Sequence, residues 1–198
     1  MKRIARVIIF GLFFVTCSSK NYENEELIAI QDIANIFLQE TLIPEELVYI
    51  SEDSILIFPF SDSLNSRVFF SDGLFPISQV KKDYGWMFKE SNLGTVDSAL
   101  FYSIVNSKRF NELKFRNFDK TKIELLKPFK QFDRTQERII TGERYSIFNF
   151  SRICFDTKRE IGVVVLGYTK GYENGTATGF RGPLLIKKQN GKWVYFKN

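Results

Sequence analysis

The chain contains no histidine and only two cysteines among its 198 residues. The lack of histidine excludes catalysis by Ser–His or Cys–His pairs and every zinc site that needs an imidazole ligand. Two cysteines are too few for a site built from four thiolates. The sequence therefore predicts no metal and no cofactor, and it leaves carboxylates as the side chains for acid–base catalysis.

A hydrophobic run long enough to span a membrane is also absent, because a spanning helix needs about 20 apolar residues. The longest apolar stretch, residues 4–15, is shorter than this and contains Arg6. Lys2 and Arg3 precede it without any acidic residue, and it stops just before Cys17. A basic start followed by a short apolar run and a cleavage point is typical of a secretory signal peptide.

The end of this stretch, Phe14-Val15-Thr16-Cys17, resembles the lipobox of bacterial lipoproteins. In that motif an aliphatic and a small residue precede a cysteine that is acylated and becomes the mature N-terminus. Val15 fits the motif, whereas Phe14 and Thr16 differ from the usual leucine and small residue. The resemblance implies fatty-acyl chains such as palmitate on Cys17, and two or more chains hold a protein stably on a membrane.

The lipoprotein resemblance divides the chain into a signal peptide over residues 1–16, a tether over 17–24 and one globular domain over 25–198. Ser18, rather than aspartate, follows the cysteine. By similarity to lipoprotein sorting in Gram-negative bacteria, this favours the outer membrane, with the domain on its periplasmic or its surface face. A cleaved signal without a lipid and an uncleaved anchor are the alternatives.

The charges of the chain are unevenly distributed. The net charge of +5 falls to +2 once residues 1–16 with their three cations are removed, and no later run of lysine and arginine exceeds two residues. We therefore predict no nucleic-acid partner. Residues 17–60 carry nine acids and one lysine, a net of −8, and residues 158–198 carry eight bases and two acids, a net of +6. This asymmetry predicts either two solvated faces or an interface between the two regions.

The N-terminal part of the domain is predicted to begin with an amphipathic helix over residues 25–42. Two strands, 47–50 and 54–60, should follow it around a turn. A second hairpin is predicted from residues 67–70 and 74–77 around Ser71-Asp72-Gly73. The apolar stripe of the helix consists of Ile30, Ile33, Ala34, Phe37 and Leu38.

One further helix is expected in the middle of the chain, from Asp97 as its N-cap through Asn106. Its spacing predicts that Ala99, Leu100, Ile104 and Val105 face inward.

The last third of the chain has the clearest strand pattern, with strands predicted over residues 145–155, 162–168, 178–188 and 192–196. Asn190-Gly191 joins the last two, and this dipeptide is the strongest short hairpin signal. The predicted fold is therefore α+β: an N-terminal amphipathic helix and one mid-chain helix against a mainly antiparallel sheet with a C-terminal four-strand meander.

Part of this region resembles a C-terminal pattern of exported proteins in Gram-negative bacteria. The pattern consists of the sequence SRICFD at 151–156, an aliphatic strand at 162–167 and the sequence KKQNGKW at 187–193. The resemblance implies a shared antiparallel sheet and no particular activity. Cys154 lies among apolar neighbours within it, which predicts a buried and unreactive thiol.

Glycines recur at positions 167, 171, 175, 179 and 182, and this recurrence predicts a mobile loop over residues 168–182 with Tyr172 and Arg181 as candidate binding residues. A phosphate-binding loop is disfavoured, because a strand rather than a helix is predicted to follow. The aromatic residues of this region are predicted to form the core face of the sheet, and stacking on a sugar is the alternative. They are Tyr168, Tyr172, Phe180, Trp193 and Tyr195.

Three Asp-Ser-aliphatic triplets resemble the sites at which some Gram-negative bacteria O-glycosylate exported proteins. The acceptor residues would be Ser54, Ser63 and Ser98. Turns and helix caps explain Asp-Ser pairs equally well.

Taken together, these patterns favour a lipid-anchored protein of the cell envelope that acts without catalysis, as a binding or accessory module for an envelope protein or a glycan. A carboxylate-dependent hydrolase of envelope polymers is the alternative, because two separated acids are sufficient for glycoside hydrolysis.

Overall fold

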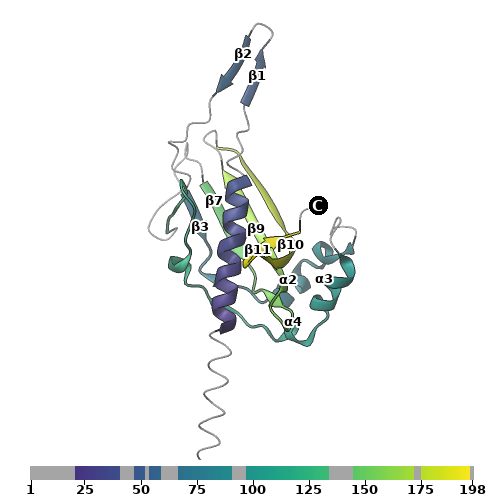
Figure 1. The fold of residues 1–198 in the computed structure, drawn as a ribbon. Coiled ribbons are helices and arrows are strands. Elements are labelled where there is room, and N and C mark those ends of the chain that lie inside the picture. The colour runs from purple at the N-terminus through teal and green to yellow at the C-terminus, as the bar shows by residue number, and fades with distance from the viewer. Residues whose placement is uncertain are drawn as a thin grey trace, which may run out of the picture.

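The computed structural model describes residues 21–40, 47–51, 54–58, 67–90, 97–133, 145–171 and 175–196. A long helix, residues 21–40, lies along one face of a central sheet, and a group of short helices packs against the other face (Figure 1). Helices and a mainly antiparallel sheet thus form three layers. The predicted α+β class is confirmed.

The central sheet has the strand order β11-β10-β9-β7-β3-β6, and β8 pairs with β9 beside this path. The pairs β7–β9, β9–β10 and β10–β11 are antiparallel, so the predicted C-terminal meander is confirmed. β3 is parallel to both β7 and β6. The strands are β3 (Arg67–Phe70), β6 (Lys130–Gln131), β7 (Tyr145–Phe150), β8 (Cys154–Phe155), β9 (Ile161–Gly171), β10 (Ala177–Gln189) and β11 (Lys192–Tyr195).

The turn between β10 and β11 has the geometry that its sequence predicts. Asn190 has a φ of 52° and Gly191 a φ of 80°. Two consecutive positive φ angles define the type I′ turn, which matches the twist of the flanking strands and which Asn-Gly favours. Lys192 consequently pairs with Gln189 directly across the turn.

Strand β9 is buried on both faces along its first half, which explains its continuous aliphatic sequence. Val164 and Leu166 belong to the hydrophobic core beneath the N-terminal helix. Val163 and Val165 point the other way, into a second core beneath the short helices. The strand therefore separates two cores.

The described part of the N-terminal helix already includes residues 21–24, which were predicted to belong to the tether, whereas the helix was predicted from residue 25. The cause is Tyr22, which extends the apolar stripe by one turn. Its ring packs edge-on against Phe155 at 5.4 Å between centroids, and its hydroxyl donates a hydrogen bond to the Ile153 carbonyl. These tertiary contacts stabilise a first turn whose sequence is otherwise polar.

The hairpin predicted around Ser71-Asp72-Gly73 is wrong. β4 (Gly73–Leu74) pairs with β5 (Arg116–Asn117), far away in the sequence. Pro76 then caps helix α2 (Ile77–Asp83), so the end of the predicted second strand is helical. Long-range packing overrides the local turn signal, because Phe70 and Leu74 are both buried in the core beneath the N-terminal helix.

The layer of short helices, on the face of the sheet opposite the N-terminal helix, contains more helix than predicted. It consists of α2, the short 3-10 helix η1 (Gly85–Phe88), α3 (Ser98–Val105) and α4 (Lys108–Glu112). Asp97 caps α3 as predicted, but Ala99 is exposed rather than inward. Phe101 takes the fully buried position on that helix.

The remaining predicted hairpin is confirmed, since β1 (Leu47–Ser51) pairs antiparallel with β2 (Ser54–Phe58). In Figure 1 it lies at the opposite end of the molecule from the start of the N-terminal helix. No helix within the described ranges is long and apolar enough to cross a membrane.

Candidate functional site

Several residues that the sequence singled out fall outside the described ranges: Cys17, Ser63 and Tyr172. Ser54 is the first residue of β2, and Ser98 is the first residue of α3. The Asp97 carboxylate accepts a hydrogen bond from the Leu100 amide at 3.0 Å, so this Asp-Ser pair serves as a helix cap. Arg181 lies in β10 rather than in a loop.

The acidic N-terminal region and the basic C-terminal region form an interface, the second of the two arrangements predicted from their charges. Lys188 pairs with Glu25 at 2.6 Å. The backbone amide of Trp193 donates to Asp32 at 2.8 Å. Carboxylates of the N-terminal helix therefore hold β10 and β11 against it, and they are not arranged around a cleft.

Trp193 is part of the core, as predicted. Its side chain is fully buried, its ring lies 4.9 Å from that of Phe155, and its indole N–H donates to Glu25 at 2.8 Å. Tyr168 is buried as well, next to Phe148 at 4.9 Å. Both aromatic side chains stabilise the fold, and Trp193 is enclosed completely.

Cys154 is fully buried, as predicted for an unreactive thiol. Burial raises the pKa of this thiol, and a contact with the Ser107 hydroxyl at 3.7 Å and the charge of Arg109 offset the rise only in part. A protonated, enclosed thiol is a poor nucleophile.

The strongest electrostatic feature of the interior is the fully buried carboxylate of Glu26. It accepts hydrogen bonds from Arg152 Nε at 2.9 and 3.0 Å, from Arg116 at 2.8 Å and from the Ile153 amide at 2.7 Å. Since both oxygens are occupied by fixed donors, Glu26 joins the helix to the β7–β8 connection and does not serve as an acid or base.

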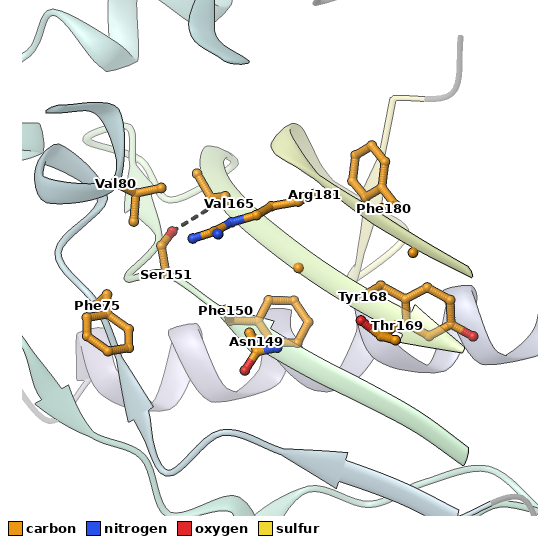
Figure 2. A pocket seen from close by; sticks show the side chains of 12 residues that line it. Phe75, Val80, Asn149, Phe150, Ser151, Val165, Tyr168, Thr169, Phe180 and Arg181 are labelled. Carbon is orange, nitrogen blue, oxygen red and sulfur yellow. Dashed lines mark hydrogen bonds between the residues drawn. The ribbon is translucent and has the colours of Figure 1, made fainter. Parts of the chain in front are cut away.

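An open groove of about 550 Å³ lies on the sheet beside α2 (Figure 2). Ligand sites in proteins commonly measure about 300–1,000 Å³, so this is a sufficient size. Its lining residues are Phe75, Val80, Asn149, Phe150, Ser151, Val165, Gly167, Tyr168, Thr169, Gly179, Phe180 and Arg181.

The floor of the groove is set by strand register. Asn149 of β7 pairs with Gly167 of β9, and Gly167 pairs with Arg181 of β10. These three residues therefore form one row across the sheet, with two polar side chains on either side of a glycine. One step along, Thr169 pairs with Gly179. Because Gly167 and Gly179 have no side chain, the floor of the groove is low between Asn149, Thr169 and Arg181.

Arg181 is held in place by an aromatic ring. Its guanidinium lies 4.0 Å from the centroid of the Tyr84 ring, just after α2, in a cation–π contact. Figure 2 shows the side chain extending over the sheet toward Ser151, with Phe75 at one end of the groove. A guanidinium stacked by one face keeps its N–H donors at the edge of the plane available for hydrogen bonds.

The chemistry of the groove is that of hydrogen bonding and packing. Arg181 is the one charged residue among the described residues that line it, and none of them is a carboxylate. The Ser151 hydroxyl donates to the Arg152 carbonyl at 2.9 Å and accepts from the Val165 amide at 2.9 Å. Because its proton is already donated to a carbonyl and no base contacts it, Ser151 is not set up as a nucleophile.

Sequence reasoning identified Arg181 but not its partners in the groove, Asn149, Gly167 and Thr169. The available signal was the recurrence of glycines, which we assigned to a mobile loop. Gly167 and Gly179 instead lie within paired strands. Only strand register reveals that they lie side by side with Asn149.

Comparison of the chain with models of protein families, with curated proteins and with solved structures found no match. The assignment of a function therefore depends on the groove and on the N-terminal sequence.

Proposed function

We propose that this protein is a lipid-anchored binding module of the bacterial outer membrane, held by acylated Cys17, and that its groove binds a glycan of the cell envelope. The observation that carries the proposal is the row Asn149–Gly167–Arg181, which places fixed polar side chains beside a low floor. The anchor rests on the signal-like start of the sequence and its cysteine.

A sugar chain fits this groove by its chemistry. Asn149 and Thr169 can each donate and accept a hydrogen bond, which suits hydroxyl groups, and Arg181 adds donors. Phe75 exposes 56% of its surface at one end and offers a flat apolar face for a sugar ring. An acidic peptide would be expected to use more cations than the single arginine of the lining. The groove therefore favours a glycan over a protein segment.

The hydrolase alternative gains no support from the described residues. The carboxylate of the buried acid Glu26 accepts hydrogen bonds from two arginines and a backbone amide, and both of its oxygens are occupied. The groove itself is lined without a described carboxylate, whereas glycoside hydrolysis needs two.

Binding can be tested by titrating soluble fragments of envelope glycans into the protein and into two variants. Arg181→Ala should weaken binding about tenfold or more, because a hydrogen bond from a charged group contributes about 1.5–3 kcal/mol. Gly167→Ala should also weaken it by raising the floor. A methyl group at Gly167 meets Asn149 at 3.5 Å, an ordinary contact, so the fold tolerates it.

Lys187→Ala is the control, because it removes a cation from β10, the strand of Arg181, at a position that does not line the groove. It should keep the affinity of the wild type. Equal affinities for the wild type, Arg181→Ala and Gly167→Ala would contradict the proposed site. Retention of a peptide ligand but of no glycan would show that the groove binds protein.

A further inference from the structure

Positive charge converges at the first described turn of the N-terminal helix. Three guanidinium groups surround the ring of Tyr22, with their central carbons 5.6, 5.9 and 5.5 Å from its centroid; they belong to Arg109, Arg152 and Arg159. Arg152 is neutralised by Glu26. Arg109 and Arg159 have no ion pair with any residue in the described ranges, although like charges so close together repel.

Both of these arginines are held by local structure. Arg109 is exposed in α4, which Ser107 caps through a hydrogen bond to the Phe110 amide at 3.3 Å. Arg159 has a φ of 58° in the turn before β9. That turn is fixed by Asp156, whose carboxylate accepts from the Glu160 amide at 2.9 Å. The fold therefore maintains two unpaired cations on one end of the molecule.

The other charges at this end do not cancel them. The described carboxylates near these arginines in the chain or at the first described turn of the helix are Glu23, Glu112, Asp156 and Glu160. Glu23 lies 3.8 Å from Arg116 and Glu112 pairs with Lys108 at 3.4 Å, which leaves Asp156 and Glu160 against the four cations of this end. Exposed Lys114 and Lys158 add to the positive charge. We name this surface the basic end; it comprises Arg109, Lys114, Lys158 and Arg159.

The length of the chain places the basic end close to the proposed lipid anchor. Only four residue steps separate Cys17 from residue 21, where the described helix begins. A fully extended chain spans at most about 3.3–3.6 Å per residue, so the start of the helix lies within about 14 Å of the acylated cysteine. This distance is close to the screening length of about 8–10 Å at moderate ionic strength.

We infer that the basic end docks on the membrane surface, where Arg109 and Arg159 contact the phosphate groups of anionic lipids. The inference rests on the proposed lipid anchor. Guanidinium groups suit phosphate because their planar donors match its oxygens. In Figure 1 the start of the helix and α4 lie at the same end of the molecule, and the β1–β2 hairpin lies at the other.

The inference can be tested with the acylated full protein in two kinds of vesicle, one of neutral phosphatidylcholine and one containing phosphatidylglycerol. Amide hydrogen exchange is measured over residues 108–114 and 156–160. We expect slower exchange in these segments in the anionic vesicles only. Raising the salt to about 1 M, where screening acts within about 3 Å, should abolish the protection.

Arg109→Gln/Arg159→Gln should lose the protection. Lys127→Gln/Lys130→Gln is the control, because it removes the same number of charges far from the basic end. In the strand register, Lys130 lies opposite Arg67, Arg67 lies opposite Tyr145, and Tyr145 lies opposite Gly171. That row lies ten residues along β9 from Ile161, about 33 Å at the rise of a strand. The control should keep the protection of the wild type.

The outcomes separate this inference from the anchor. Protein that remains on both kinds of vesicle without protection of the two segments would overturn the docking surface and leave the anchor intact. Protein that remains on neither would overturn both. Equal protection by inorganic phosphate without vesicles would show an anion site and overturn docking on a membrane.

Discussion

Replacing the buried carboxylate of Glu26 should be among the most damaging single changes to this fold. Glu26→Gln keeps the size of the side chain but replaces one acceptor oxygen by an NH2 donor. In the wild type the two oxygens together accept from Arg152, Arg116 and the Ile153 amide at 2.7–3.0 Å. The variant therefore directs a donor at other donors and leaves a positive charge without its counter-ion.

The size of the effect follows from burial. Glu26 is fully buried, and the side chain of Arg152 is only 10% exposed. Removing one partner of such a pair costs about 3–5 kcal/mol, because the remaining charge is left in a medium of low polarity. For a domain of this length, 1 kcal/mol lowers the melting temperature by about 2–4 °C, so Glu26→Gln should lower it by about 6–20 °C.

Glu112→Gln is the control, because its partner Lys108 is almost fully exposed and such pairs contribute about 0–1 kcal/mol. The assay is urea unfolding followed by tryptophan fluorescence, with thermal unfolding in parallel. A loss of less than about 1 kcal/mol for Glu26→Gln, equal to that of the control, would refute the reasoning that this carboxylate joins the helix to the sheet.

Three further outcomes follow from the interior. Trp193→Ala should lower the free energy of unfolding by about 3–5 kcal/mol. Trp193→Phe loses mainly the hydrogen bond to Glu25 and should lower it far less. Equal unfolding midpoints of the two variants would place the ring outside the core. Cys154 should resist a thiol reagent at pH 8 until urea unfolds the protein, as followed by mass spectrometry of its peptide; rapid labelling of the native protein would contradict its burial. Burial and the hydrogen bond to Glu40 raise the pKa of Tyr195 in the folded protein. The protonated hydroxyl therefore contributes to the free energy of unfolding fully below the unfolded-state pKa near 10, and this contribution is lost as the pH rises further. Wild-type stability should therefore fall more steeply above pH 10 than that of Tyr195→Phe, and parallel urea midpoints would disprove this.

The parts of the fold that local sequence could predict are those with local causes. The type I′ turn at Asn190-Gly191 and the cap at Asp97 depend on one or two residues each. The apolar stripe of the N-terminal helix depends on periodicity alone. Each was visible without knowledge of any distant contact.

The features that were missed depend on residues far apart in the chain. The first helical turn forms because Tyr22 reaches Ile153, and the expected hairpin at Gly73 is replaced by pairing with Arg116–Asn117. The groove requires that Gly167 lie between Asn149 and Arg181, which the register of three strands decides. No window of sequence contains that information.

The central claim is that the groove binds an envelope glycan without altering it. The most direct test incubates the protein with a purified envelope glycan of known chain length, and then measures both its retention on the protein and the length of the recovered chains. We expect retention that Arg181→Ala reduces, together with full recovery of intact chains. Shortened chains or new reducing ends produced by the wild type would contradict a binding module and identify a hydrolase.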